Sequence, residues 1–160
     1  MKDLTITAII KVYQYDELNE GDRSLIKTAM EATARSYSPY SHFSVGAAAL
    51  LGNGTVVTGT NQENAAYPSG LCAERTTLFY ANSQYPDQSV VTLAIAARTE
   101  KDFIDHPIPP CGACRQVILE TGKRYKQPIR ILLYGKECIY EVKSIGDLLP
   151  LSFDASAMED

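Results

Sequence analysis

The sequence is poor in cysteine, has no excess of positive charge and contains no long apolar run. Its 160 residues include 4 cysteines, which is too few for the disulfide scaffold of a small secreted protein. No apolar stretch approaches the roughly 20 residues that a membrane-spanning helix requires. Met1-Lys2-Asp3 is followed by alternating residues rather than by the apolar segment of a signal peptide. We therefore expect a cytoplasmic protein with no membrane partner.

The charge balance argues against a polyanionic partner. The chain carries 15 Lys and Arg against 19 Asp and Glu, a formal net charge of −4. Attraction to phosphates supplies most of the non-specific affinity of proteins for nucleic acids, and this charge provides none over the chain as a whole. The longest basic cluster, Lys123, Arg124 and Lys126, is short. We expect a small, neutral binding partner and no nucleic acid.

Hydrophobic periodicity predicts alternating strands and helices in a single domain over residues 1–160. Alternation predicts a strand over residues 4–12, and an apolar stripe at helical spacing predicts a helix over residues 21–36. An Asn-Gly turn is expected at residues 52–54. Further strands are expected at 43–51, 55–60, 90–97, 129–134 and 138–142, and further helices at 73–82 and 112–121, with a last helical turn at 144–149.

This order of elements predicts an α/β fold. A strand–helix–strand–helix–strand succession implies parallel strands joined by right-handed crossovers. We expect a three-layer α/β/α arrangement whose mixed sheet has roughly five strands and is covered by helices on both faces.

Three of the four cysteines stand where a helix is expected to begin. Cys72 precedes Ala73-Glu74-Arg75, while Cys111 and Cys114 form a Cys-x-x-Cys motif at the start of the following helix. The positive end of a helix dipole favours thiolate over thiol. We expect the two helix starts to meet at the carboxyl ends of adjacent parallel strands, which would bring three thiolates together.

Three cysteine ligands favour catalytic zinc, because they leave the metal one open position for water. Zinc lowers the pKa of that water toward ~7. Glu74 is placed two residues after a ligand, where its carboxylate can take the proton and pass it to a substrate. Three thiolates and one zinc ion carry net negative charge, and Arg75 is the natural donor to the sulfurs. In that role, Arg75→Ala raises the pKa of the bound water.

Other interpretations of the cysteines stay open at this point. A lone Cys-x-x-Cys is more often a structural zinc site or a redox pair. A fourth ligand from Cys138, His42 or His106 would close the site and leave an interaction module. The redox interpretation fits less well, because Cys111 follows two prolines and Cys72 would have no role. Otherwise we interpret Cys138 as a small buried hydrophobe and the two histidines as ordinary loop residues.

Four separated segments carry a family resemblance. They are residues 37–47 (YSPYSHFSVGA), 61–67 (NQENAAY), 72–75 (CAER) and 110–116 (PCGACRQ), followed by Leu148-Leu149-Pro150 and Phe153. With these segments the chain resembles the cytidine deaminases of the small three-cysteine class. The resemblance covers about residues 20 to 153. Residues 1–19 form an N-terminal extension, whose expected strand either adds an edge to the sheet or contacts another subunit.

The resemblance implies hydrolytic deamination of free cytidine and deoxycytidine to uridine and deoxyuridine plus ammonia, as in pyrimidine salvage. It implies attack of a zinc-bound hydroxide on C4, with one zinc per subunit on Cys72, Cys111 and Cys114 and with Glu74 as the proton shuttle. It also implies a homotetramer whose active sites are shared between subunits.

The substrate contacts implied by the resemblance come from six residues. They are Asn61 and Glu63 at the ribose hydroxyls, Phe43 beside the nucleoside, Ala73 at the base edge, Tyr67 near the inter-subunit part of the site, and Phe153 stacked on the base from a neighbouring subunit. By pattern alone, Phe43 is better interpreted as a core residue than as a substrate contact. Asn61 and Glu63 fit solvated loop residues as well as they fit substrate contacts. Phe153 could serve as a surface anchor without a substrate role.

Two other activities belong to the same chemistry. One is deamination of another aminated heterocycle, such as blasticidin S, and the ribose pair Asn61–Glu63 argues against it. The other is deamination within RNA or DNA, which the acidic composition disfavours.

Overall fold

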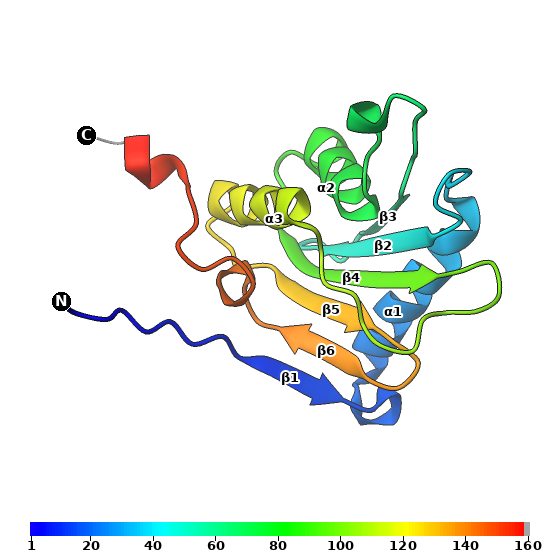
Figure 1. Ribbon diagram of the computed structural model, residues 1–160, viewed down its shortest axis with the longest axis horizontal. Coiled ribbons are helices and arrows are strands. Elements are labelled where there is room, and N and C mark those ends of the chain that lie inside the picture. Colours follow the sequence, from blue (N-terminus) through cyan, green and yellow to red (C-terminus); the bar gives the residue numbers. More distant parts are fainter. Residues whose placement is uncertain (159–160) are drawn as a thin grey trace.

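The computed structural model describes residues 1–158, so residues 159 and 160 of the predicted domain lie outside the described part (Figure 1). Its centre is a six-stranded sheet with the order β1-β6-β5-β4-β2-β3. The strands are β1 (Ile10–Tyr13), β2 (Ser44–Leu51), β3 (Val56–Thr60), β4 (Val90–Arg98), β5 (Arg130–Tyr134) and β6 (Ile139–Val142).

Helices cover both faces of this sheet. Helix α1 (Glu20–Ala32) packs on one face, while α2 (Ala73–Gln84) and α3 (Gly112–Arg124) lie together on the other (Figure 1). A hydrophobic cluster fills each interface. The α/β/α prediction is confirmed, and the sheet has a sixth strand because the N-terminal extension adds β1.

The directions of the strands correct one expectation. Only β4 and β5 are parallel neighbours, and the other neighbouring pairs are antiparallel. The expectation that the cysteine-bearing helices follow adjacent parallel strands is therefore wrong. Helix α2 follows β3 and α3 follows β4, and β2 lies between these two strands. Both strands nevertheless run antiparallel to β2, so their carboxyl ends lie at the same edge of the sheet.

Local chemistry decides where α1 begins and ends. The Asn19 side chain accepts a hydrogen bond from the Asp22 N–H and caps the helix, and Leu25, Ile26 and Ala29 are buried. The helix was predicted over 21–36, but a 3-10 turn replaces its last part (Thr33–Arg35). The Thr33 hydroxyl donates to the Met30 carbonyl at 2.7 Å, a local bond that competes with helix continuation.

Two glycines shape the hairpin that leads to α2. Gly54 has a φ of 85° in the β2–β3 turn, a conformation that L side chains rarely adopt. A Cβ at Gly59 in β3 would lie 2.5 Å from the Thr77 hydroxyl of α2, so only glycine permits this close approach. The start of α2, which carries Cys72 and Glu74, is thereby held against the sheet.

The predicted N-terminal strand is shorter than expected. Only Ile10–Tyr13 forms a strand, where Ile10 pairs with Val142 and Tyr13 with Ile139 of β6. The pairing stops because β6 ends at Val142, which leaves residues 1–9 without a partner strand. None of the helices within residues 1–158 has both the length and the apolar character needed to cross a membrane.

Candidate active site

The three predicted cysteine ligands lie together at two helix N-termini. Cys72 is the N-cap of α2, Cys111 is the N-cap of α3, and Cys114 lies in the first turn of α3. Their sulfur atoms lie within 4.8 Å of one another, and Cys72 Sγ and Cys111 Sγ are 3.8 Å apart. Tetrahedral zinc with bonds of about 2.3 Å requires sulfur separations of about 3.8 Å. The cluster fits zinc.

No fourth protein ligand joins this group within residues 1–158. His42 pairs with Glu100 at 3.1 Å, and His106 pairs with Glu137 at 3.3 Å. All four cysteines are free, and Cys138 lies outside the cluster. A three-cysteine group without a further side-chain ligand matches the open coordination of a catalytic zinc centre.

Arg75 supplies positive charge to the sulfurs. Its Nη2 lies 3.8 Å from Cys72 Sγ, and this hydrogen bond raises the pKa of the guanidinium. Without metal, a hydrogen bond from Cys114, supported by Arg75, lowers the pKa of Cys72 to about 5. The same contact with the Cys72 thiolate, together with burial, raises the pKa of Cys114. Arg75 and the neighbouring thiol thus favour the thiolate form of Cys72.

Glu74 is a buried carboxyl group beside the cysteine cluster. The residue is 5 % exposed. Burial, followed by the charge of Cys72, raises its pKa above the ordinary value for a glutamate. A carboxyl group with a raised pKa gives up and takes back a proton near neutral pH more readily than an exposed one. This position suits proton transfer beside the metal ligands.

A cavity of about 640 Å³ opens in front of the cluster, within the range of small-molecule sites. Cys72, Glu74 and Arg75 line its floor. The cavity also contains five of the predicted substrate residues: Phe43, Asn61, Glu63, Tyr67 and Ala73. The fold therefore brings residues from three separated segments of the chain to one place.

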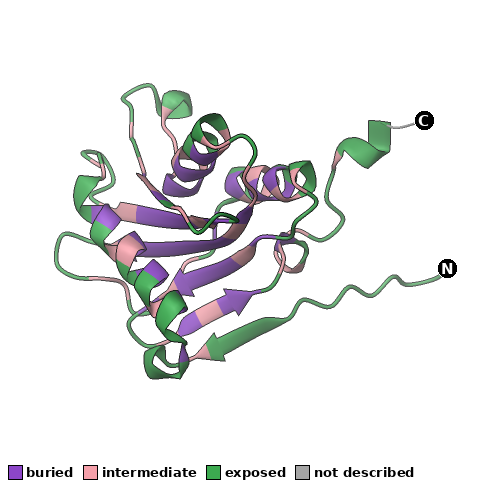
Figure 2. Cartoon of the chain, turned by 180° about the vertical axis from the view of Figure 1, so that it is seen from behind, coloured by how far each residue is buried: buried purple, intermediate pink, exposed green. Residues whose placement is uncertain are grey.

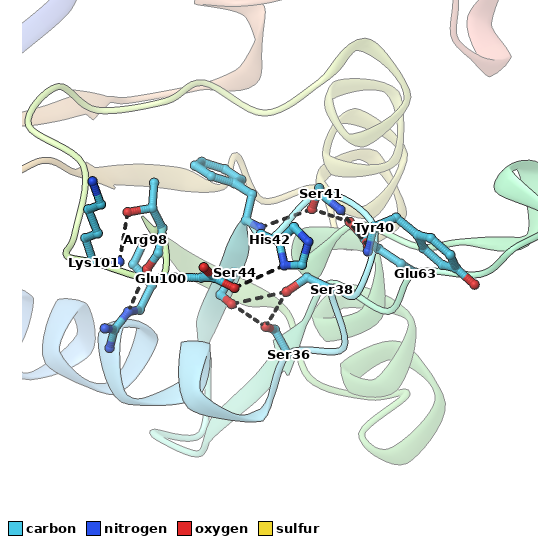
Figure 3. Close-up of polar contacts among 12 residues, drawn as sticks. Ser36, Ser38, Tyr40, Ser41, His42, Ser44, Glu63, Arg98, Glu100 and Lys101 are labelled. Atoms are coloured by element: carbon cyan, nitrogen blue, oxygen red, sulfur yellow. Dashed lines mark hydrogen bonds and ion pairs between the residues drawn. The ribbon is translucent and has the colours of Figure 1, made fainter.

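The loop that precedes β2 holds the carboxylate of Glu63 (Figure 3). The backbone N–H groups of Tyr40 and Ser41 donate to Glu63 Oε2 at 2.9 and 3.2 Å, and the Ser41 hydroxyl donates to Oε1. These bonds, above all that from the Ser41 side chain, lower the pKa of Glu63. Glu63 is thus held as an oriented carboxylate at the cavity rather than as a freely moving loop residue.

Asn61 and Phe43 are fixed by each other. The Asn61 Oδ1 accepts from the Val45 N–H, and its Nδ2 donates to the Phe43 carbonyl, both at 2.9 Å. Phe43 lies just before β2 rather than within it, and neither hydrophobic cluster includes it. Its half-buried ring lines the cavity instead, in contrast to the core packing that the pattern alone favoured.

Sequence reasoning did not assign Tyr40 and Ser41, although both stand in the first motif segment. Tyr40 and Tyr67 meet edge to face at the cavity, with ring centroids 6.0 Å apart. Ser41 acts on a residue 22 positions away, so only its place between Tyr40 and Phe43 in the motif hinted at a role.

The same loop has support on its far side (Figure 3). The hydroxyls of Ser36 and Ser44 share a hydrogen bond of 2.7 Å, with Ser38 3.3 Å from both. His42, with a φ of 54°, carries the ion pair to Glu100. These contacts tie the loop to β2 and to the segment after β4.

Phe153 lies apart from this cavity. It is 63 % exposed and is not among the cavity-lining residues. Its carbonyl accepts from Gln116 of α3 at 2.9 Å, and the neighbouring Asp154 pairs with Lys123 at 2.9 Å. The tail that bears Phe153 therefore lies beside α3 (Figure 1), and the Phe153 side chain is exposed at the surface.

Comparison with known proteins agrees with this site. The family described as "Cytidine and deoxycytidylate deaminase zinc-binding region" matches residues 19–127. A cytidine deaminase of Halalkalibacterium halodurans is 43 % identical over 136 residues, which cover 85 % of this chain and 96 % of the relative.

Solved structures give the same result. A cytidine deaminase of Burkholderia pseudomallei is 38 % identical with a TM-score of 0.70, covering 85 % of this chain and 100 % of that one. One from Mycobacterium tuberculosis is 35 % identical with a TM-score of 0.66, covering 85 % and 99 %. The resemblance inferred from the sequence is thus confirmed: the chain belongs to the zinc-dependent cytidine and deoxycytidylate deaminases, a family of hydrolases.

Proposed function

We propose that this chain deaminates free cytidine and deoxycytidine to uridine and deoxyuridine plus ammonia, in pyrimidine salvage. The observation that carries this proposal is the buried Glu74 carboxyl group beside three clustered cysteine sulfurs, in one cavity with the oriented carboxylate of Glu63. The relatives named cytidine deaminases support the same activity.

In this proposal Cys72, Cys111 and Cys114 hold one zinc ion per subunit. When bound, zinc lowers the pKa of a water molecule, so that a nucleophile for C4 of cytosine is available at neutral pH. Glu74 accepts one proton of the nucleophilic water and passes it to N3 of the pyrimidine, then accepts the second proton from the oxygen added at C4 and delivers it to the amino group, which leaves as ammonia. Its raised pKa suits both directions of transfer. The backbone of Ala73, at the first position of α2, faces the base edge.

Arg75 offsets the charge of the sulfurs through its hydrogen bond to Cys72. We expect Arg75→Ala to retain zinc and to move the pH–rate profile to higher pH, because less positive charge then remains beside the thiolates. An unchanged profile would remove Arg75 from this role.

Ribose recognition is assigned to Glu63 and Asn61. The Glu63 carboxylate is fixed by three donors and still has lone pairs for a sugar hydroxyl. The Asn61 carboxamide fixes the backbone of Phe43 and Val45, with one N–H and one oxygen lone pair left for substrate. This pair favours a nucleoside over a free base or a heterocycle without a sugar.

Phe153 takes part only in an oligomer. Its ring is exposed and lies outside the cavity of its own chain, so we assign it to the site of a neighbouring subunit in a homotetramer. Tyr67, which is 77 % exposed at the cavity, would lie near that contact.

The decisive test is ammonia release from cytidine and deoxycytidine, with zinc content measured in the same sample. We expect Glu74→Gln to retain zinc and to lose about 10²–10⁴-fold in kcat, the contribution typical of a positioned acid–base group. Glu120→Gln, on the exposed face of α3, is the matched control and should behave as the wild type. Zinc-loaded protein that releases no ammonia from either nucleoside would refute the proposal.

A substrate panel separates the related activities. Blasticidin S would be favoured over cytidine only if the ribose contacts were wrongly assigned. A gel-shift with tRNA and single-stranded DNA should show no binding, in keeping with the net charge of −4.

A further inference from the structure

The N-terminal arm, which we define as residues 4–13, exposes an unusual amount of apolar side chain. Leu4, Ile6, Ile9, Ile10 and Val12 are 42–76 % exposed. Figure 2 shows the arm and most of β1 as exposed, running away from the body of the molecule. Large contiguous apolar patches on a protein surface mark interaction sites.

The backbone of the arm is also unpartnered over much of its length. No N–H group of residues 4–8 has a hydrogen-bond partner within residues 1–158, and the Ile9 N–H donates to the Asp147 carboxylate at 3.0 Å. Because β1 is the first strand in the sheet order, its outer edge faces no other strand among residues 1–158. An apolar sheet edge with unpaired backbone groups is a template for pairing with another chain.

Neither the proposed activity nor the shared family explains this arm. The family match begins at residue 19, after the arm has ended. The arm also lies outside the cavity that contains the catalytic and substrate residues.

We propose that the arms of two copies of this chain pair as antiparallel strands about a two-fold axis at Ala8. The pairing joins the two sheets through their β1 edges and supplies hydrogen bonds to alternate residues within 4–8, because every second N–H of an antiparallel strand points to a given partner. Such a contact uses the same surface on both copies, which is the usual form of a two-fold interface.

The apolar set as a whole selects this axis, because an axis at Thr7 or Ile9 keeps the same side-chain parity but leaves one apolar residue opposite a polar one. In antiparallel strands, directly opposed residues lie on the same face, and the apolar set Leu4, Ile6, Ala8, Ile10 and Val12 occupies alternate positions. A two-fold axis at Ala8 opposes Leu4 to Val12, Ile6 to Ile10 and Ala8 to itself. A shift of the axis by half a residue would instead pair each residue of this apolar set with an odd-numbered residue, whose side chain lies on the other face of the strand.

The charges agree with this register. Lys11 faces Thr5 of the other copy, and Asp3 faces Tyr13, so no like charges oppose each other. The small side chain of Ala8 stands where a residue must meet its own copy.

The apolar set of the arm continues one face of the sheet. Ile10 and Val12 point to the sheet face that carries α2 and α3, because their β6 partners Val142 and Tyr140 pack there.

Cysteine cross-linking tests the register on the full-length, zinc-loaded protein. Opposed antiparallel residues have Cα atoms about 4.5–5.5 Å apart, within disulfide range, whereas diagonal neighbours are about 7–8 Å apart and beyond it. We expect Ala8→Cys to form a disulfide dimer under mild oxidation. The matched controls Thr7→Cys and Ile9→Cys should not, because each is diagonal to its own copy. The wild-type protein, oxidised in parallel, shows how much dimer the native cysteines form by themselves.

Equal cross-linking at positions 7, 8 and 9, or none at position 8, would overturn the proposal. The double variant Thr7→Cys/Ile9→Cys should cross-link, because these two positions oppose each other. Ammonia release by all variants should stay at the wild-type level, so that failure here is separate from failure of the proposed activity.

Hydrogen exchange gives a second, independent measurement. In the wild type, alternate amides within residues 4–8 should exchange at least tenfold more slowly than in Ile6→Lys, with protection increasing with protein concentration. Adding Ile10→Glu to Ile6→Lys should restore the protection, because each lysine then faces a glutamate. Unprotected wild-type amides, or a double variant no better than the single one, would overturn the pairing.

Discussion

Replacing Arg130 by Met tests the buried ion-pair network that joins α1 to the sheet. Arg130 of β5 donates two hydrogen bonds to the Asp22 carboxylate of α1, at 2.6 and 2.7 Å. Its Nε donates to Glu141 of β6 at 3.1 Å. Methionine keeps much of the side-chain volume but leaves both carboxylates without their cation.

The structure sets the magnitude of the loss. Asp22 and Glu141 are only 8 % and 7 % exposed, so each would keep a poorly solvated charge. Breaking a buried pair by removing one partner costs about 3–5 kcal/mol. Arg130 is itself 30 % exposed and Asn19 still donates to Asp22, so we expect the lower end, about 3 kcal/mol, and a fall in Tm of about 6–12 °C.

The loss should shrink as the pH falls. Burial raises the pKa of Glu141 in the folded wild type, but the hydrogen bonds of Arg130 and Tyr13 and the charges of Arg130 and Lys11 together outweigh it, and the pKa is lowered. This stabilisation is present above the unfolded pKa of Glu141 and is lost as the pH falls through its folded value. In Arg130→Met, only Tyr13 and Lys11 still oppose burial, so the pKa of Glu141 in the folded state is higher than in the wild type and Glu141 takes up a proton at higher pH. Wild type and variant therefore converge in acid.

Chemical unfolding of the zinc-loaded proteins at pH 7.5 and pH 5 measures this effect. Lys27→Met, which removes an exposed pair with Glu31, is the matched control and should change the free energy of unfolding by less than about 0.5 kcal/mol. Asp22→Asn with Glu141→Gln should restore part of the stability of Arg130→Met. A variant within about 0.5 kcal/mol of wild type at pH 7.5, or a difference that grows in acid, would refute the reasoning.

Three further predictions concern the site. Ser41→Ala should raise the KM for cytidine severalfold while kcat and zinc content change little, because it frees the Glu63 carboxylate without touching the metal; an unchanged KM would contradict this role. Gly59→Ala should lower the free energy of unfolding by about 1–3 kcal/mol and reduce turnover, because the new Cβ meets Thr77 and displaces α2, as unfolding and kinetic assays would show. Removing zinc with a chelator should lower the Tm and expose three thiols to Ellman's reagent, and re-addition of zinc should reverse both; a Tm that is unaffected would argue against a zinc site on the cysteines.

The residues proposed for metal binding and proton transfer are predictable from the sequence because their relations are local. Cys72 and Glu74 lie in one helix turn, as do Cys111 and Cys114, and helix N-termini favour thiolates at these positions. Hydrophobic periodicity likewise predicts α1 and the strands of the core. The spacing of residues along the chain is therefore enough to predict these helices, these strands and the grouping of the cysteines with Glu74.

The surroundings of these residues depend on contacts between distant segments. Strand direction follows from pairing rather than from periodicity, so the order of β3, β2 and β4 was not predicted. The Ser41–Glu63 contact spans 22 residues, and the burial that raises the pKa of Glu74 comes from the packing of the site. Alternation predicts a strand over residues 4–12, but β6 is long enough to pair only with residues 10–13.

The sequence alone determined the grouping of three cysteines with a neighbouring glutamate and the α/β class, because short spacings and periodicity encode them. Only the tertiary structure decided that one cavity joins Glu63, Asn61 and Phe43 to the cysteines, and that the Phe153 ring lies outside it. It also left the edge of β1 open. Distances between remote segments are set by how strands pair and helices pack, which no local pattern records.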